Sequence, residues 1–357
     1  MPTALRNSLA PGDMASQLIK ATGRQAHSTA ARYSTLQHTT ILTTMSFNDL
    51  NGVWRTTDPG AAGDYNYVLE LSAGTDGALS GYMRAPQALF YLRGRIDPEP
   101  RPAARPDGGI AFGWTVSRRA EQVVAESTTG FAAQYFPEAD RIVAQWIIAE
   151  STTPAETWNS ANVGSVVYTR SRGGQLEEPI GSPEPEAQAA AAYDYTRLTG
   201  TWYNELGSCV ELAADRLFGL SGKYNSSVGE AASEYFLGGT FDRALAAGAD
   251  GGSGKGVTLG WSVGWNNAAN GDSHSASTWA GQVFFGGDPA GDVITTQWLL
   301  TVSTASTRVW ASTNAGADVF RRTQPDAATV ARVKAAGFGA AHPSVSEIVA
   351  RGEKYAK

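Results

Sequence analysis

An internal repeat limits the possible folds of this chain more than any other feature of its sequence. Residues 50–54 (LNGVW) recur as residues 198–202 (LTGTW), 148 positions later. Other segments recur at nearly the same offset, which indicates two copies of one domain of about 125 residues whose loops differ slightly in length. The further pairs are 113–116 with 260–263 at an offset of 147, 144–148 with 296–300 at 152, and Trp158 with Trp310 at 152.

Alternation along the repeated segments predicts the fold class. In copy two, one face of several short segments is built from every second residue and is mainly apolar, which is typical of half-buried antiparallel strands. About eight such segments, joined by Gly, Asn and Asp turns, predict an up-and-down barrel that can hold one small ligand. We therefore expect an all-β chain of two tandem eight-stranded antiparallel barrels. The clearest inward rows are Val257, Leu259, Trp261, Val263 and Trp265; Ser275, Ser277, Trp279, Gly281 and Val283; and Ile294, Thr296, Trp298 and Leu300.

The repeat and the local composition predict the domain boundaries. A first barrel is expected over residues 46–171 and a second over residues 196–322. Residues 172–195 are rich in Gly, Pro, Glu and Ala, which is typical of an exposed linker. In the C-terminal tail, residues 323–357, Val330 and Val333 fall at helical spacing, so part of the tail is expected to be helical.

Residues 1–45 are expected to form a disordered leader. They lack the long apolar core of a secretory signal peptide, and their basic residues among many Ser and Thr resemble a transit peptide. A further interpretation is an extension ahead of a start at Met45. The sequence therefore does not identify the compartment.

Charge and motif content argue against several functions. The formal net charge is −6 and no basic run is present, which disfavours nucleic acid and anionic membranes as partners. No stretch approaches the roughly 18 apolar residues of a spanning helix. The four histidines lack metal-ligand spacing, and the chain has no Gly-x-Ser-x-Gly elbow. We expect a protein that is not an enzyme and has no cofactor or metal.

Polar side chains interrupt the inward faces near one end of several strands. Ser, Asn, Tyr and Asp occur there beside Trp. A buried polar group without a partner costs about 1–3 kcal/mol, so these groups must meet one another, water or a ligand. The pattern alone leaves two interpretations open: a polar cap with trapped water, and an apolar pocket whose few convergent polar groups bind a small molecule.

Four segments of copy two carry recognisable motifs: 200–208 (GTWYNELGS), 259–265 (LGWSVGW), 274–282 (HSASTWAGQ) and 295–301 (TTQWLLT). In order and spacing, nearly all of copy two resembles the avidin/streptavidin family. The resemblance implies a streptavidin-like barrel that binds biotin with high affinity and without catalysis, with vitamin sequestration as one possible purpose. The alternative is a lectin-like or other small-molecule binding module.

The resemblance also implies roles for individual side chains. Asn204, Ser208 and Tyr224 match three donors to the ureido oxygen of biotin. Donors that converge on one oxygen stabilise negative charge there. Asp318 and Ser226 match the acceptors for the two ureido N–H groups.

Other matching residues belong to the mouth and walls of the implied pocket. Ser277 stands where the family usually has Thr, facing the thioether sulfur. Ser275 and the backbone of Glu230 match contacts to the valerate carboxylate, and the negative charge of Glu230 is expected to weaken binding. Trp310 matches the residue that one subunit lends to its neighbour's pocket. The walls are matched by Trp265, Trp279 and Trp298, with Leu206, Val228 and Leu300 beside them.

Copy one departs from this pattern at the polar positions. Because several hydrogen bonds would be lost together, we expect no tight biotin binding there. Copy one is then a structural pseudo-subunit or a barrel for another ligand. Thr56 replaces Asn204, Tyr67 replaces Ser208, Met83 replaces Tyr224, Arg118 replaces Trp265 and Val166 replaces Asp318, whereas Ser127, Thr129, Phe131, Trp146, Ile148 and Trp158 stay compatible.

The retained tryptophans predict an assembly. Trp158 and Trp310 are both present although copy one lacks its own ureido contacts. In the resembling family this tryptophan serves a neighbouring barrel, and tetramers contain four barrels. We therefore expect a homodimer whose four barrels form a pseudo-tetramer, since twofold symmetry is the commonest closed arrangement.

Overall fold

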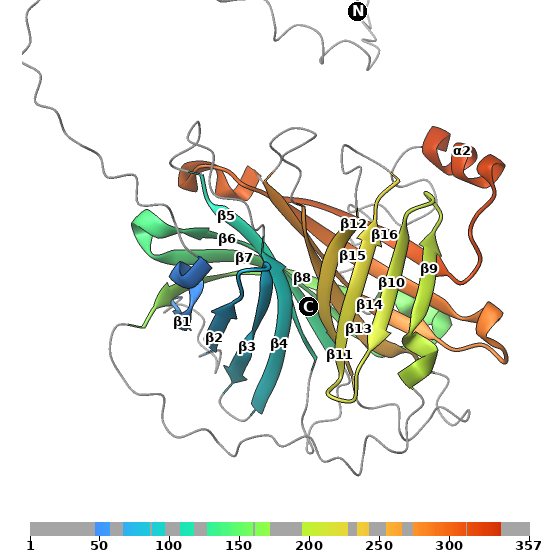
Figure 1. Ribbon diagram of the computed structural model, residues 1–357, viewed down its shortest axis with the longest axis horizontal. Coiled ribbons are helices and arrows are strands. Elements are labelled where there is room, and N and C mark those ends of the chain that lie inside the picture. Colours follow the sequence, from blue (N-terminus) through green and yellow to red (C-terminus); the bar gives the residue numbers. More distant parts are fainter. Residues whose placement is uncertain are drawn as a thin grey trace, which may run out of the picture. The chain divides into compact units, whose positions relative to one another are not determined.

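The computed structural model describes residues 47–57, 67–85, 88–96, 108–117, 127–159, 161–171, 195–227, 234–242, 255–265, 274–311 and 313–336. Within them the chain forms two closed barrels of eight antiparallel strands each, β1–β8 and β9–β16 (Figure 1). Each barrel is an up-and-down meander that closes when its first strand pairs with its last. The predicted fold class is confirmed. Residues 1–45 and 172–194, which hold the expected leader and most of the linker, lie outside the described residues.

The elements of the two barrels follow the same order. The first comprises η1 (Phe47–Leu50), β1 (Gly52–Thr56), β2 (Val68–Ala73), β3 (Ala78–Ala85), β4 (Ala88–Ile96), β5 (Ile110–Ser117), β6 (Ser127–Phe136), η2 (Pro137–Ala139), β7 (Arg141–Glu150), η3 (Pro154–Asn159) and β8 (Ala161–Arg170). The second comprises η4 (Tyr195–Leu198), β9 (Gly200–Asn204), β10 (Cys209–Ala214), β11 (Gly219–Asn225), β12 (Glu234–Phe241), β13 (Val257–Trp265), β14 (Ser275–Phe284), η6 (Pro289–Gly291), β15 (Val293–Val302), η7 (Ser306–Ala311) and β16 (Thr313–Arg321). Helix α2 (Ala327–Ala336) follows.

Each barrel buries its own aromatic core. In the second barrel the core contains Trp202, Trp261 and Phe320, and in the first it contains Trp54 and Trp114. Trp261 belongs to an inward row predicted from alternation, and Val257, Leu259 and Val263 of the same row join the core because successive side chains of a strand point to opposite faces. The residues at alternate positions of each strand therefore face the barrel interior.

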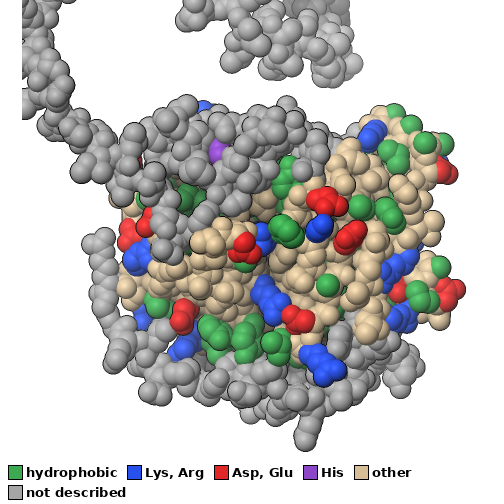
Figure 2. Space-filling model, in the orientation of Figure 1, with side chains coloured by type: hydrophobic (Ala, Val, Ile, Leu, Met, Phe, Trp, Pro, Cys, Tyr) green, Lys and Arg blue, Asp and Glu red, His purple; other side chains and the backbone are tan. Residues whose placement is uncertain are grey.

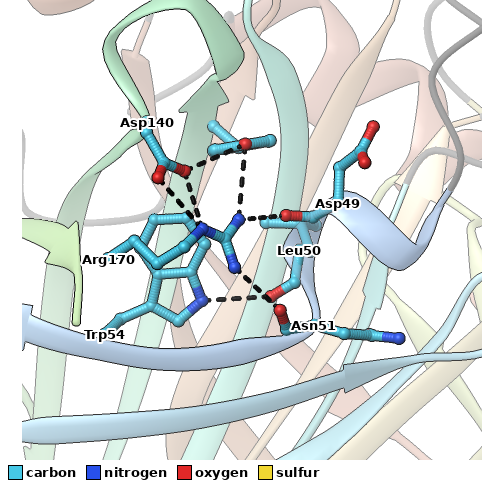
Figure 3. Close-up of polar contacts among 7 residues, drawn as sticks. Asp49, Leu50, Asn51, Trp54, Asp140 and Arg170 are labelled. Atoms are coloured by element: carbon cyan, nitrogen blue, oxygen red, sulfur yellow. Dashed lines mark hydrogen bonds and ion pairs between the residues drawn. The ribbon is translucent and has the colours of Figure 1, made fainter. Parts of the chain in front are cut away.

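An arginine closes the end of the first barrel where η1 lies (Figure 3). The guanidinium of Arg170 lies 4.1 Å from the ring centroid of Trp54, and its Nε donates to the Asp140 carboxylate at 2.8 and 3.1 Å. It also donates to the backbone oxygens of Asp49 and Asn51. Since Trp54 Nε1 donates to the Leu50 carbonyl at 3.0 Å, helix η1, β1 and β8 are joined at one point.

The second barrel repeats this closure. Arg322 lies 3.6 Å from the ring centroid of Trp202, whose Nε1 donates to the Leu198 carbonyl at 3.0 Å. Arg322 donates to the backbone oxygens of Thr199 and Arg197. The site described below lies toward the opposite end of the second barrel.

The barrels pack face to face through β4–β7 of the first and β12–β15 of the second. A small apolar cluster crosses the boundary and contains Ala132, Ile147, Ala149, Ala280 and Leu299. Hydroxyl groups surround it. Thr115 bonds to Thr240 at 3.0 Å, Ser117 donates to Thr240 at 2.9 Å, and Thr128 donates to Thr258 at 3.0 Å. These buried hydroxyls pair with one another across the interface, as buried polar groups in a stable interior do.

On the side of the molecule drawn in Figure 2, the described surface carries both charges. Figure 2 shows basic and acidic side chains interspersed over the described surface of one side, with no continuous area of either charge. None of the described helices has the length and apolar character needed to cross a membrane. The described residues also contain no group of three or more His, Cys, Asp or Glu side chains placed to hold a metal ion.

Candidate functional site

The candidate site begins at the tight turn between β9 and β10. Asn204 ends β9 and is 2% exposed. Its Oδ1 accepts the backbone N–H groups of Leu206 at 3.1 Å and Ser208 at 2.8 Å. These two bonds fix the amide, and its Nδ2 points toward the neighbouring last strand, β16. The local sequence thus builds a turn whose side chain faces inward.

Asp318 on β16 receives that amide. Asn204 Nδ2 donates to Asp318 Oδ1 at 3.2 Å, and Trp279 Nε1 donates to Oδ2 at 2.9 Å. Asp318 is only 5% exposed. A buried carboxylate without donors would be very costly, so these two bonds hold it in place as an acceptor inside the barrel.

Tyr224 on β11 adds a hydroxyl to the same group. Its side chain is 4% exposed, and its hydroxyl is hydrogen-bonded to Ser208. Burial raises the pKa of the Tyr224 phenol well above its ordinary value, and the negative charge of Asp318 raises it further. The phenol therefore stays protonated near neutral pH and can act as a donor.

Aromatic rings enclose the space beside these polar groups. Tyr224 stacks on Trp279 with ring centroids 5.0 Å apart, and Trp279 stacks on Trp261 at 5.8 Å. Trp265 meets Tyr224 edge to face at 5.6 Å. Trp298 packs against the same core. Flat apolar walls with a few convergent polar groups are the usual form of a small-molecule pocket.

The strand ends around Trp265 form the mouth. Trp265 Nε1 donates to Ser277 Oγ at 2.8 Å, and Trp265 lies opposite Ser275 in the strand register. Both serines are about 95% buried, at 4% and 5% exposure. Ser275 and Ser277 alternate along β14 and share its inward face. Their hydroxyls therefore line the barrel wall next to Trp265.

Helix α2 lies beside this mouth. A side-chain carbon added at Gly207, in the β9–β10 turn, would lie 3.5 Å from Val330 of the helix. Lys334 Nζ donates to the Ser227 carbonyl at 3.4 Å, in the segment that follows β11. Ser227 in turn donates from its backbone N–H to Ser208 Oγ at 3.0 Å. The helix thus supports the turn and the loop that carry Ser208.

The contacts above bring together seven of the side chains singled out in the sequence: Asn204, Ser208, Tyr224, Trp265, Ser277, Trp279 and Asp318. Leu206 is buried in the β9–β10 turn, Ser226 follows β11, and Leu300 lies opposite Ser277 in the strand register. Val228 and Glu230 lie outside the described residues, as does the side chain of Trp310. Tyr235 of β12 was not singled out, although it is 5% exposed and lies opposite Tyr224. Its place in an alternating row was the available signal.

The first barrel has a different set of residues at the equivalent positions. Its turn bond runs from Thr56 N–H to the Tyr67 carbonyl, as the bond from Asn204 to Ser208 does in the second barrel. Met83 lies opposite Leu69 as Tyr224 lies opposite Val210. Val166 lies opposite Ala144 as Asp318 lies opposite Thr296. The turn bond and the two registers place Thr56, Tyr67, Met83 and Val166 at positions equivalent to Asn204, Ser208, Tyr224 and Asp318; Arg118 lies outside the described residues.

A comparison with known protein families agrees with this geometry. Residues 192–323 match the sequence model of the avidin family. The matched range contains all eight strands of the second barrel and the polar side chains inside it, among them Asn204, Ser208, Tyr224 and Asp318.

Proposed function

We propose, from the premise that the second barrel is an avidin-family domain of a tandem streptavidin-like chain, that this barrel binds biotin without catalysis. The observation that carries the proposal is the buried carboxylate of Asp318, held by Asn204 and Trp279. It offers an acceptor for a ligand N–H beside two potential donors, the hydroxyls of Ser208 and Tyr224. A cyclic urea, which carries N–H groups next to one carbonyl oxygen, fits that arrangement.

The first barrel is proposed as a structural pseudo-subunit. Met83 and Val166 are apolar where the second barrel has Tyr224 and Asp318. Each missing hydrogen bond lowers affinity by about 0.5–1.5 kcal/mol, and several are missing together. Biotin is thus expected to bind once per chain, in the second barrel. A lectin-like module is the alternative function.

Calorimetric titration with biotin tests both statements, because it gives affinity and stoichiometry together. One tight site per chain is expected, and Asp318→Ala should abolish most of the heat. Two equivalent sites per chain would refute the assignment of copy one. A protein that ignores biotin but binds an immobilised glycan would favour the lectin-like alternative.

We further propose that two chains form a four-barrel dimer. Within one chain, the segments that carry Trp158 and Trp310 pack on the other barrel near its closed end. Thr157 of η3 bonds to Thr295 at 2.8 Å, and Val309 of η7 packs against Phe136 and Val143. Each contact lies near the closed end of the barrel that receives it, away from the mouth of that barrel, so a tryptophan that serves a neighbouring pocket would serve one on a second chain.

A further inference from the structure

The hydroxyl of Tyr235 is an unpaired polar group inside the second barrel. Tyr235 is 5% exposed, and its Oη has no hydrogen-bond partner among the residues that the structure describes. Its ring meets Trp265 edge to face, with centroids 5.0 Å apart. An unpaired buried hydroxyl costs about 1–3 kcal/mol, so a phenylalanine would suit the free protein better.

The first barrel provides the comparison. Met83 lies opposite Phe90 in that barrel as Tyr224 lies opposite Tyr235 in the second. Phe90 packs against the first core with no hydroxyl at all. The fold therefore does not require a phenol at this position, and the hydroxyl is absent from the copy that also lacks Tyr224 and Asp318.

A second unpaired group in the same core occurs in both barrels. Trp261 Nε1 also has no partner within the described part of the chain, and neither does Trp114 Nε1 at the equivalent position of the first barrel. That feature is shared by both copies and belongs to the common scaffold. The Tyr235 hydroxyl is present only beside the complete polar set.

The position of Tyr235 assigns it to the mouth half of the site. It is the second residue of β12, directly after the segment that bridges β11 and β12. The Trp265 ring that it contacts belongs to the strand position opposite Ser275, at the end of β13. A polar tail that leaves the pocket would pass between these residues.

We propose that the Tyr235 hydroxyl is a further ligand-binding donor of this pocket, which bonds to the carboxylate tail of the bound ligand. The inference rests on the proposed binding of biotin. A phenol that donates to a carboxylate forms a charge-assisted bond, which is stronger than a neutral one. The unpaired state of the hydroxyl in the free protein is then the cost of a contact that forms only on binding.

The test uses Tyr235→Phe in the full chain, with Tyr203→Phe on the outer face of β9 as the matched control. Biotin and its carboxamide are titrated against each protein, and thermal unfolding of the free proteins is recorded. We expect Tyr235→Phe to weaken biotin binding about tenfold and carboxamide binding less, with the free variant as stable as the wild type or more so. The control should match the wild type in both ligands.

Three results would overturn the proposal. Unchanged biotin affinity of Tyr235→Phe would show that the ligand does not use the hydroxyl. Equal weakening for biotin and its carboxamide would remove the carboxylate as its partner. A free variant less stable than the wild type would assign the hydroxyl to the fold. Failure of the proposed function is distinct, because the wild-type protein itself would then not bind biotin.

Discussion

Gln282 of the second barrel and Thr152 of the first form a two-bond pair across the barrel boundary. Gln282 Oε1 accepts from the Thr152 N–H at 2.7 Å, and its Nε2 donates to the Thr152 hydroxyl at 3.0 Å. Gln134 and Thr304 form the equivalent pair with the barrels exchanged, at 2.7 and 3.3 Å. Each barrel therefore holds the loop after the seventh strand of the other.

Replacing Gln282 with leucine should separate this contact from the rest of the interface. The Thr152 N–H would lose its acceptor, so the free energy of unfolding is expected to fall by about 1–3 kcal/mol. Urea denaturation measures the change. Gln134→Leu is the matched variant and should produce a similar loss. Two variants that unfold like the wild type would show that the barrels do not depend on these loops.

Asp318→Ala should weaken biotin binding by more than Ser275→Ala does. Asp318 is a buried charged acceptor with two donors, whereas Ser275 stands at the mouth. Hydrogen bonds to charged groups contribute about 1.5–3 kcal/mol, and neutral ones roughly half of that. Competition titration compares the two affinities. Equal losses would show that the polarity of the pocket is not arranged as proposed.

Stability should fall in alkaline solution because of buried tyrosines. Burial raises the pKa of Tyr224 and of Tyr168 above the ordinary value of about 10. Above that pH the unfolded chain has lost phenolic protons that the folded chain keeps. The folded state then binds more protons, so the free energy of unfolding decreases as pH rises.

Urea unfolding at several pH values from about 8 to 11 checks this dependence. The contribution of these tyrosines should be complete below about pH 10 and decline above it. Tyr224→Phe should reduce the decline, and Tyr203→Phe on the outer face should not. A decline of the same size in Tyr224→Phe would remove Tyr224 as a cause.

Arg170→Lys should loosen the closed end of the first barrel. Lysine retains the charge but has no planar group to stack on Trp54 and no Nε–H to donate to both oxygens of Asp140. We expect a loss of about 1–2 kcal/mol in the free energy of unfolding, because one cation–π contact and one partly exposed ion pair are weakened. Biotin stoichiometry should stay unchanged, since the site is in the other barrel. A variant as stable as the wild type would contradict the role of this closure.

The proposed dimer predicts that a tryptophan from a second chain slows the release of biotin. Light scattering should give twice the 37.6 kDa mass of one chain. Trp310→Ala or Trp158→Ala should speed biotin release, because a second chain would supply one of these side chains to the pocket. A monomer whose release rate ignores both substitutions would refute the shared-pocket assembly.

The sequence alone determined the repeat, the barrel class and most of the candidate site. Strand alternation has a period of two, so a row such as Trp261, Val263 and Trp265 identifies its inward face before any contact is known. The turn from Asn204 to Ser208 is local, and its bonds follow from residues two and four positions apart. Because the two copies align, the sequence alone also shows that copy one has Met83 and Val166 in place of Tyr224 and Asp318.

Only the tertiary structure decided how groups from distant strands are paired. The bond between Trp279 and Asp318 joins β14 to β16, and the pair of Gln282 with Thr152 joins different barrels. Periodicity identifies an inward or outward side chain but not the partner that it meets, because partners depend on barrel closure and on which outer faces pack together. The unpaired hydroxyl of Tyr235 is visible for the same reason only in three dimensions, where the neighbours of a buried group can be examined.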